Sequence, residues 1–130
     1  MKANLIAPCG MNCGICMAFL REKNRCPGCR SLGVKHPKCR IRNCADMNGR
    51  YCFSCSGFPC RLLKNLDKRY RKKYGMSMIE NLESIRAVGI RKFVTSEKER
   101  WACPGCGGTI NVHRHCCSIC GARVPPRSYD

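Results

Sequence analysis

The stretch CPGCGGTINVHRHCCSICG, residues 103–121, contains two Cys-x2-Cys pairs with ten residues between them. A Cys-x2-Cys turn directs both sulfurs toward one point, and two such turns supply the four thiolates that a tetrahedral zinc ion takes. A glycine follows each pair, so the backbone can close tightly there. Residues 109–113 alternate in the manner of a strand. We therefore predict a zinc-ribbon-like module over residues 102–124, with zinc bound by Cys103, Cys106, Cys117 and Cys120.

Three more residues of this stretch have side chains that can bind metal. Cys116 lies outside the two pairs, directly after His115, and the sequence leaves it as a bystander or an alternative ligand. His113 and His115 are interpreted as solvated strand residues, because four thiolates already complete a structural zinc site.

The whole chain is rich in cysteine and in positive charge. It has 15 cysteines and a formal net charge of +17 in 130 residues, and Leu, Ile, Val and Phe together supply only 24 residues. So little apolar surface would ordinarily predict disorder, because burial would not offset the entropy of ordering the backbone. A structural zinc contributes on the order of 10 kcal/mol of folding free energy and can replace a missing core. We therefore predict a small, metal-stabilised α+β protein.

The first 61 residues hold ten of the cysteines, two more than two four-ligand sites require. The sequence leaves three explanations open: two metals with spare thiols, bridging sulfurs, or an iron–sulfur cluster. The spacing favours placing Cys26 and Cys29 with Cys39 and Cys44, and the last three cysteines with part of the first motif. His36 could add an eleventh ligand. The predicted ligands are Cys9, Cys13, Cys16, Cys26, Cys29, Cys39, Cys44, Cys52, Cys55 and Cys60.

Two other uses of these cysteines fit the sequence poorly. A disulfide scaffold needs an oxidising compartment, and we expect none because residues 1–9 contain no apolar stretch long enough for a signal peptide. The Cys-x3-Cys-x2-Cys motif at Cys9, Cys13 and Cys16 also occurs in radical S-adenosylmethionine enzymes, but these need a barrel of roughly 200 or more residues. No run approaches the ~20 apolar residues of a membrane span. We expect a cytoplasmic protein without a membrane partner.

The cysteine motifs of the first half resemble those of a known family. They comprise residues 7–16 (APCGMNCGIC), 26–29 (CPGC), 39–44 (CRIRNC) and 52–60 (CFSCSGFPC). In these motifs the chain resembles the cysteine-rich domain of unknown function 3795, which is widespread in anaerobic archaea and bacteria. The resemblance implies metal binding in a reducing cell, with zinc or an iron–sulfur cluster in the N-terminal module. It implies no reaction.

Residues 62–101 contain no cysteine and predict helices. Pro59 suits the first turn of a helix that ends at Gly75. Ser77 and Glu80 form a capping box for the next helix, and Gly89 separates that helix from a third. The apolar positions at helical spacing are Leu62, Leu63, Leu66 and Tyr70 in the first helix, Met78, Leu82 and Ile85 in the second, and Ile90, Phe93, Val94 and Trp101 in the third. The predicted organisation is a metal module (1–61), a helical segment (62–101), the ribbon-like module (102–124) and a tail (125–130).

The first of these helices is strongly basic and carries two tyrosines. A basic stripe with aromatic rings suits a phosphate backbone and exposed bases. The alternative is a solvated face whose charge balances the metal–thiolate sites. The candidate nucleic-acid-binding residues are Lys68, Arg69, Tyr70, Arg71, Lys72, Lys73 and Tyr74.

These features favour a non-catalytic zinc-binding protein that docks on nucleic acid or an acidic protein. An iron–sulfur electron-transfer protein and a metal-handling protein are the alternatives. The sequence favours no enzyme class, because it contains no glycine-rich phosphate loop, Ser–His–acid set or paired carboxylates.

Overall fold

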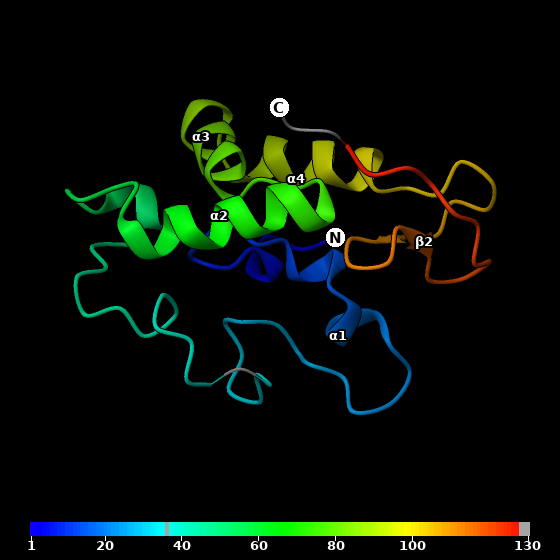
Figure 1. Cartoon of the computed structure of the whole chain (residues 1–130), viewed down its shortest axis with the longest axis horizontal. Helices are drawn as coiled ribbons and strands as arrows, with labels where there is room; N and C mark the ends of the chain where they lie inside the picture. The colour runs from blue at the N-terminus through cyan, green and yellow to red at the C-terminus, as the bar shows by residue number, and fades with distance from the viewer. Residues whose placement is uncertain (36, 128–130) are drawn as a thin grey trace.

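The computed structural model describes residues 1–35 and 37–127 of the chain (Figure 1). An irregular cysteine-rich segment comes first, three helices follow, and a two-stranded hairpin ends the described chain. The predicted fold class is confirmed. The elements in order are η1 (Ala3–Leu5), η2 (Cys13–Ile15), α1 (Met17–Leu20), η3 (Cys52–Ser54), α2 (Arg61–Tyr74), α3 (Met78–Val88), α4 (Ile90–Arg100), β1 (Ile110–Asn111) and β2 (Cys116–Cys117).

Helix α2 ends where the sequence predicts but begins later. Gly75 adopts a left-handed conformation with φ of 65°, and a Cβ there would lie 2.5 Å from the carbonyl oxygen of Arg127. Only glycine fits this position, so the helix stops. Pro59 was predicted in the first turn, whereas the helix begins at Arg61. The difference arises because Cys60 is still extended, with φ of −77° and ψ of 169°, and serves as the N-cap.

Helices α3 and α4 follow their predicted signals closely. The Ser77 hydroxyl accepts a hydrogen bond from the Glu80 N–H at 3.0 Å, which satisfies one of the free donors at the start of α3. Gly89, with φ of 84°, lies between the two helices. The predicted apolar positions face inward. The buried ones are Met78, Leu82, Ile85, Phe93 and Trp101.

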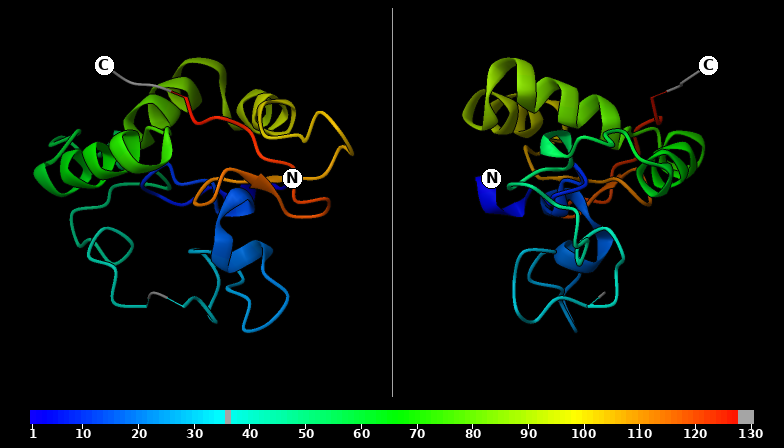
Figure 2. Two further views of the ribbon diagram at one scale, coloured as in Figure 1. Left: turned by 45° about the vertical axis from the view of Figure 1, so that its right-hand side comes forward. Right: turned by 90° about the vertical axis from the view of Figure 1, so that its left-hand side faces the viewer.

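A single core joins the three regions of the chain. Ile6 and Ile15 from the N-terminal segment are fully buried in one cluster with Leu63 and Leu82 from the helices and Val112 from the C-terminal region. Figures 1 and 2 show α2, α3 and α4 on one side of the N-terminal segment, and the irregular chain of residues 21–35 and 37–50 on the other. The helices therefore provide the platform on which both cysteine-rich regions rest.

The first cysteine motif docks directly on α3. Gly10 has φ of 90°, and a Cβ there would lie 2.6 Å from the carbonyl oxygen of Met78. The Asn81 side-chain amide, 2% exposed, donates a 2.9 Å hydrogen bond to the Gly10 carbonyl. This backbone-to-helix contact fixes the position of Cys9 and Cys13 relative to the helices.

The C-terminal region is a short antiparallel hairpin. Ile110 pairs with Cys117 and Asn111 with Cys116. The predicted alternation of residues 109–113 is not seen in burial, because Ile110, Asn111 and Val112 are all buried. Among the described residues, no helix has the length and apolar character that crossing a membrane requires.

Candidate metal centres

The C-terminal hairpin brings four thiols together as predicted. The sulfurs of Cys103, Cys106, Cys117 and Cys120 all lie within 4.8 Å of one another. The Cys103 and Cys120 sulfurs are 3.7 Å apart, and those of Cys106 and Cys117 are 3.5 Å apart. A tetrahedron of sulfurs around zinc, with bonds of about 2.3 Å, has edges of roughly 3.8 Å. The four thiols thus stand close to the geometry of a tetrahedral metal site.

Backbone N–H groups point at these sulfurs. Gly105 donates to the Cys103 sulfur at 3.4 Å, and Gly108 donates to the Cys106 sulfur at 3.4 Å. Cys117 accepts from the N–H groups of Cys120, at 3.5 Å, and Ile119, at 3.3 Å, and these bonds lower the pKa of its thiol to about 6. Because metals bind the thiolate, the backbone of this turn prepares Cys117 to act as a ligand.

The other metal-binding side chains of the hairpin lie outside this set. Cys116 is in β2 opposite Asn111. His113 is half-buried rather than solvated: its Nδ1 accepts from the Met17 N–H at 3.2 Å, and its Nε2 lies 3.0 Å from the Tyr70 hydroxyl. The Met17 donor requires an unprotonated Nδ1, so the proton of a neutral ring is on Nε2. His113 therefore links the hairpin to α1 and α2.

In the N-terminal module, four cysteines are neighbours around α1. The Cys29 N–H donates to the Cys13 sulfur at 3.4 Å, and Cys16 and Cys29 pack against the small cluster that contains Cys26. Cys16 interacts electrostatically with Cys26 and Cys29, and burial raises the pKa of its thiol. Backbone N–H groups also reach this set, because Lys35 donates to the Cys26 sulfur at 3.4 Å. The structure thus joins the last two cysteines of the first motif to the Cys26/Cys29 pair.

A second group of four cysteines surrounds a small hollow of about 30 Å³. Burial raises the pKa of the Cys52 thiol to about 11, and the nearby thiols of Cys60, Cys44, Cys55 and Cys39 act in the same direction. The other side chains around the hollow are apolar. The full lining is Ile41, Cys44, Met47, Cys52, Cys55, Phe58, Cys60 and Leu62.

The two remaining cysteines, Cys9 and Cys39, lie along a separate cleft of about 690 Å³, which Cys29 also borders. Cys9 is buried, which raises the pKa of its thiol to about 12. Lysines 35 and 38 and Arg69 are at the rim of this cleft. Cys44 therefore lies beside Cys52 rather than beside Cys26, which differs from the pairing that the spacing favours.

The two N-terminal groups are looser than the C-terminal one. Among residues 1–35 and 37–127, only the four C-terminal cysteines bring three or more metal-binding side chains close enough together to hold one ion. His36, the possible eleventh ligand, lies outside the described residues.

The basic helix presents some of its candidate residues to solvent and holds others inside. Lysines 68, 72 and 73 and Arg69 are exposed. Arg71 instead pairs with the buried carboxylate of Asp67, with 2.9 Å between Nε and Oδ2. The rings of Tyr70 and Tyr74 lie 5.7 and 4.8 Å from the His113 ring. The structure thus offers a cationic face, whereas the two aromatic rings already pack against the hairpin.

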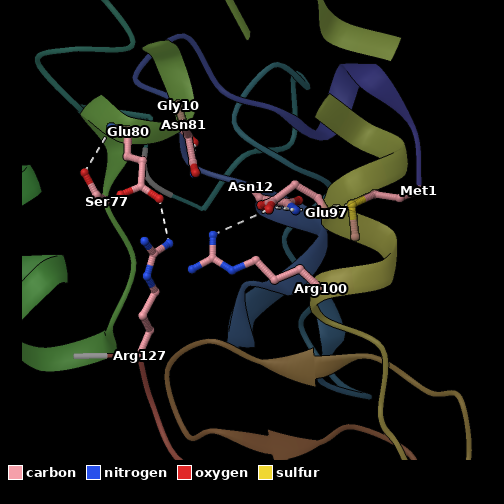
Figure 3. A network of polar contacts seen from close by, with 9 residues as sticks. All are labelled: Met1, Gly10, Asn12, Ser77, Glu80, Asn81, Glu97, Arg100 and Arg127. Atoms are coloured by element: carbon pink, nitrogen blue, oxygen red, sulfur yellow. Dashed lines mark hydrogen bonds and ion pairs between the residues drawn. The ribbon is translucent and has the colours of Figure 1, made fainter. Parts of the chain in front are cut away.

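Sequence analysis missed a buried polar contact that joins the N-terminal module to α4 (Figure 3). The Asn12 amide, fully buried, donates to Glu97 Oε1 at 3.2 Å, and its own oxygen accepts from the Gly14 N–H at 2.9 Å. Glu97 is 3% exposed, and Arg100 Nη1 lies 3.7 Å from its other oxygen. Asn12 and Glu97 are 85 residues apart, and although Asn12 lies within the first cysteine motif, that motif gives no sign of a partner on α4.

Comparison with known families covers the N-terminal module. Residues 5–65 match the family described as "Protein of unknown function (DUF3795)". The resemblance of the first cysteine motifs is confirmed. No curated protein and no solved structure matches the chain. The family match supplies no reaction or ligand, so function has to be argued from the cysteine sites.

Proposed function

We propose that this chain is a non-catalytic metal-binding protein and that its C-terminal hairpin holds one structural zinc ion. The gathering of the four sulfurs of Cys103, Cys106, Cys117 and Cys120 within 4.8 Å carries this proposal. Zinc accepts four thiolates in a tetrahedron without any preference from d electrons, and such a site has no open position for a substrate. The zinc would tie the two turns of a hairpin that has only two pairs in its strands.

The N-terminal module supports the same function. Its ten cysteines are collected around two centres and a cleft, and residues 21–35 and 37–50 contain no regular helix or strand. Such a segment needs cross-links other than backbone ladders, and metal–thiolate bonds supply them in a reducing cell. An iron–sulfur cluster uses the same ligands and is the competing cofactor for this module.

Metal analysis of protein purified without oxygen tests the proposal. We expect a colourless protein that contains zinc, including one equivalent released by changing Cys103 to Ser. Visible charge-transfer absorption with stoichiometric iron and acid-labile sulfide would replace zinc with a cluster and favour the electron-transfer function. Protein that folds without binding any metal would overturn the proposal.

We also propose that the exposed face of α2 docks on nucleic acid. Its support is the row of exposed cations that includes Arg69, Lys72 and Lys73, on a helix with a single acid that is already paired with Arg71. Part of the charge elsewhere is used inside the fold: Arg30 Nε donates to the Ile6 carbonyl at 2.7 Å, and Arg42 Nε to the Cys29 carbonyl at 2.6 Å. The face of α2 gathers several exposed cations on one helix, where they are available to a phosphate backbone.

A matched pair of triple variants tests docking. Changing Arg69, Lys72 and Lys73 to Gln should flatten the salt dependence of binding to single-stranded RNA by about two units, because each lost phosphate contact removes roughly 0.7. The control changes Arg91, Lys92 and Lys98, which are exposed on α4, to Gln and removes the same charge. Equal effects from the two variants would mean that only net charge matters and would remove nucleic acid from the proposal.

A further inference from the structure

We propose that the N-terminal module holds two separate four-thiolate metal ions. One is bound by Cys13, Cys16, Cys26 and Cys29, and the other by Cys44, Cys52, Cys55 and Cys60. Cys9 and Cys39 are then not ligands, and the chain binds three metal ions in all. The inference rests on the proposed metal-binding function and assigns the partners that sequence spacing leaves open.

The first site rests on contacts among its four members. The Cys29 N–H donates to the Cys13 sulfur at 3.4 Å, and Cys16 and Cys29 both pack against the small cluster that contains Cys26. The Lys35 N–H donates to the Cys26 sulfur, also at 3.4 Å. Backbone N–H donors to sulfur are found in the C-terminal site as well, and metal-binding turns commonly supply them.

The second site rests on the character of its hollow. Four cysteines face it, and the remaining lining consists of Ile41, Met47, Phe58 and Leu62, which carry no charge. A metal cation bound between these cysteines would convert them to thiolates and offset the cost of their charge in apolar surroundings. Four cysteines around one hollow equal the ligand number of a single tetrahedral ion, and we assign zinc to this site.

The two cysteines that remain share a different location. Cys9 and Cys39 both border the cleft of about 690 Å³, where Lys35, Lys38 and Arg69 supply the charged groups. The assignment leaves out the two cysteines that border this cleft and belong to neither group, whereas Cys29, which borders it as well, also contacts Cys13 through its N–H.

Each of the two sites would fix a different part of the irregular chain. The first would fix residues 26–29 against α1, and the second would fix Cys44 against η3 and the N-cap of α2. Their sulfurs lie farther apart than those of the C-terminal site, so metal binding must draw each group together. That closure stabilises a region whose own apolar cluster, Ala18, Cys26 and Val34, is small.

Double Cys→Ser variants of the full chain, each lacking two thiols, test the assignment by metal count in native mass spectrometry. We expect three ions in the unchanged protein, two in C13S/C29S, two in C44S/C60S and one in C29S/C44S. The control C9S/C39S should keep three. If C29S/C44S keeps two, those cysteines share one site and the assignment is wrong, as it is if C9S/C39S loses an ion.

Native alkylation provides a readout that does not depend on how a variant folds. In the unchanged protein, N-ethylmaleimide should modify the partly exposed Cys39 and Cys116, and it should spare the buried Cys9 and, until a chelator is added, the twelve assigned ligands. Modification of any N-terminal ligand at the rate of Cys39 would overturn the inference. A chain that binds one ion, at the C-terminal site alone, would overturn the inference and leave the zinc hairpin standing, whereas a chain without metal would overturn both.

Discussion

The two cysteine-rich regions reach their geometry by different routes. In the C-terminal hairpin, the four ligands lie within 18 residues, and their sulfurs stand within 4.8 Å of one another, with N–H groups directed at Cys103, Cys106 and Cys117. In the N-terminal module, the ligands of each proposed site come from turns separated by longer irregular chain, and the sulfurs are less closely gathered. Local turns can prepare a site by themselves, whereas distant turns must be brought together by the rest of the fold.

This difference has an energetic consequence. A site whose sulfurs already stand close together, such as the C-terminal one, loses little conformational entropy when the metal binds, so more of the binding energy appears as affinity. A site whose sulfurs lie farther apart uses part of that energy to order its own chain. The C-terminal site should therefore bind metal more tightly, and the N-terminal sites should be more strongly coupled to folding.

The largest effect on metal content and folding is expected from removing one of the four cysteines of the C-terminal site. Changing Cys103 to Ser should release one zinc ion and unfold the hairpin, because a structural zinc contributes on the order of 10 kcal/mol. Metal analysis and circular dichroism would measure both effects. Changing Cys116, the adjacent non-ligand in β2, should release none. Equal metal loss from both variants would mean that the four ligands are misassigned.

Stepwise metal removal tests the comparison directly. With increasing chelator in reducing buffer, the N-terminal ions should leave first and the C-terminal ion last, as followed by alkylation of the newly freed cysteines. Protection of Cys103 and Cys117 should outlast that of Cys26 and Cys52. The reverse order would show that preparation of the sulfurs does not determine affinity in this chain.

A smaller effect is expected at the buried contact between the N-terminal module and α4. Changing Asn12 to Ala removes the donor to Glu97 and the acceptor for Gly14, so unfolding free energy should fall by about 1–3 kcal/mol. Denaturant titration of the zinc-loaded protein would measure it. The exposed Asn48 provides the control, and its change to Ala should cost less than about 0.5 kcal/mol. If both variants have the same stability, the contact does not join the two regions.

The smallest effect on stability is expected from the charge of Glu97, in the same contact. Burial raises the pKa of the Glu97 carboxyl above its ordinary value of 4.5, so the folded state binds the proton more tightly than the unfolded state. Stability should therefore decline as pH rises from 4.5 through the folded pKa. In a Glu97→Gln variant, the new side chain keeps an oxygen that can accept from the Asn12 amide, but it cannot ionise.

The measured quantity is the stability of the unchanged protein minus that of the Glu97→Gln variant, because metal binding contributes equally to both. This difference should become less favourable with increasing pH and amount to about 1 kcal/mol or less at neutral pH. A difference that grows with pH would mean that the Arg100 pair outweighs the cost of burial.

Sequence reasoning succeeded where the decisive interactions are local. Gly75, Ser77 and Gly89 set helix ends through their own backbone preferences or through a hydrogen bond three residues away. The gathering of the four C-terminal cysteines was predictable for the same reason, since each pair forms one turn. Pro59 was misplaced by two residues because a proline signal permits a helix start but cannot show that Cys60 remains extended.

Sequence reasoning failed where contacts join distant segments. The cysteines of the N-terminal module have no periodicity to indicate which turns meet, so spacing favoured Cys44 beside Cys26, and the fold placed it beside Cys52. The role of His113 also depends on a residue far along the chain, since Met17 lies 96 positions away. A histidine in a segment that was predicted as a short strand gives no sign of such a partner.

The sequence by itself determined that this protein is rich in cysteines whose short spacings place sulfurs in pairs, and the small number of apolar residues led to the prediction of a metal-stabilised fold. It also determined the three helices, whose caps and apolar faces are local properties. Tertiary structure decided which thiols face one another, which cations remain on the surface and which polar side chains are buried between modules. Those outcomes depend on how the cysteine-rich segment packs against α3 and α4. Local sequence patterns do not predict the packing between segments that are distant in the chain.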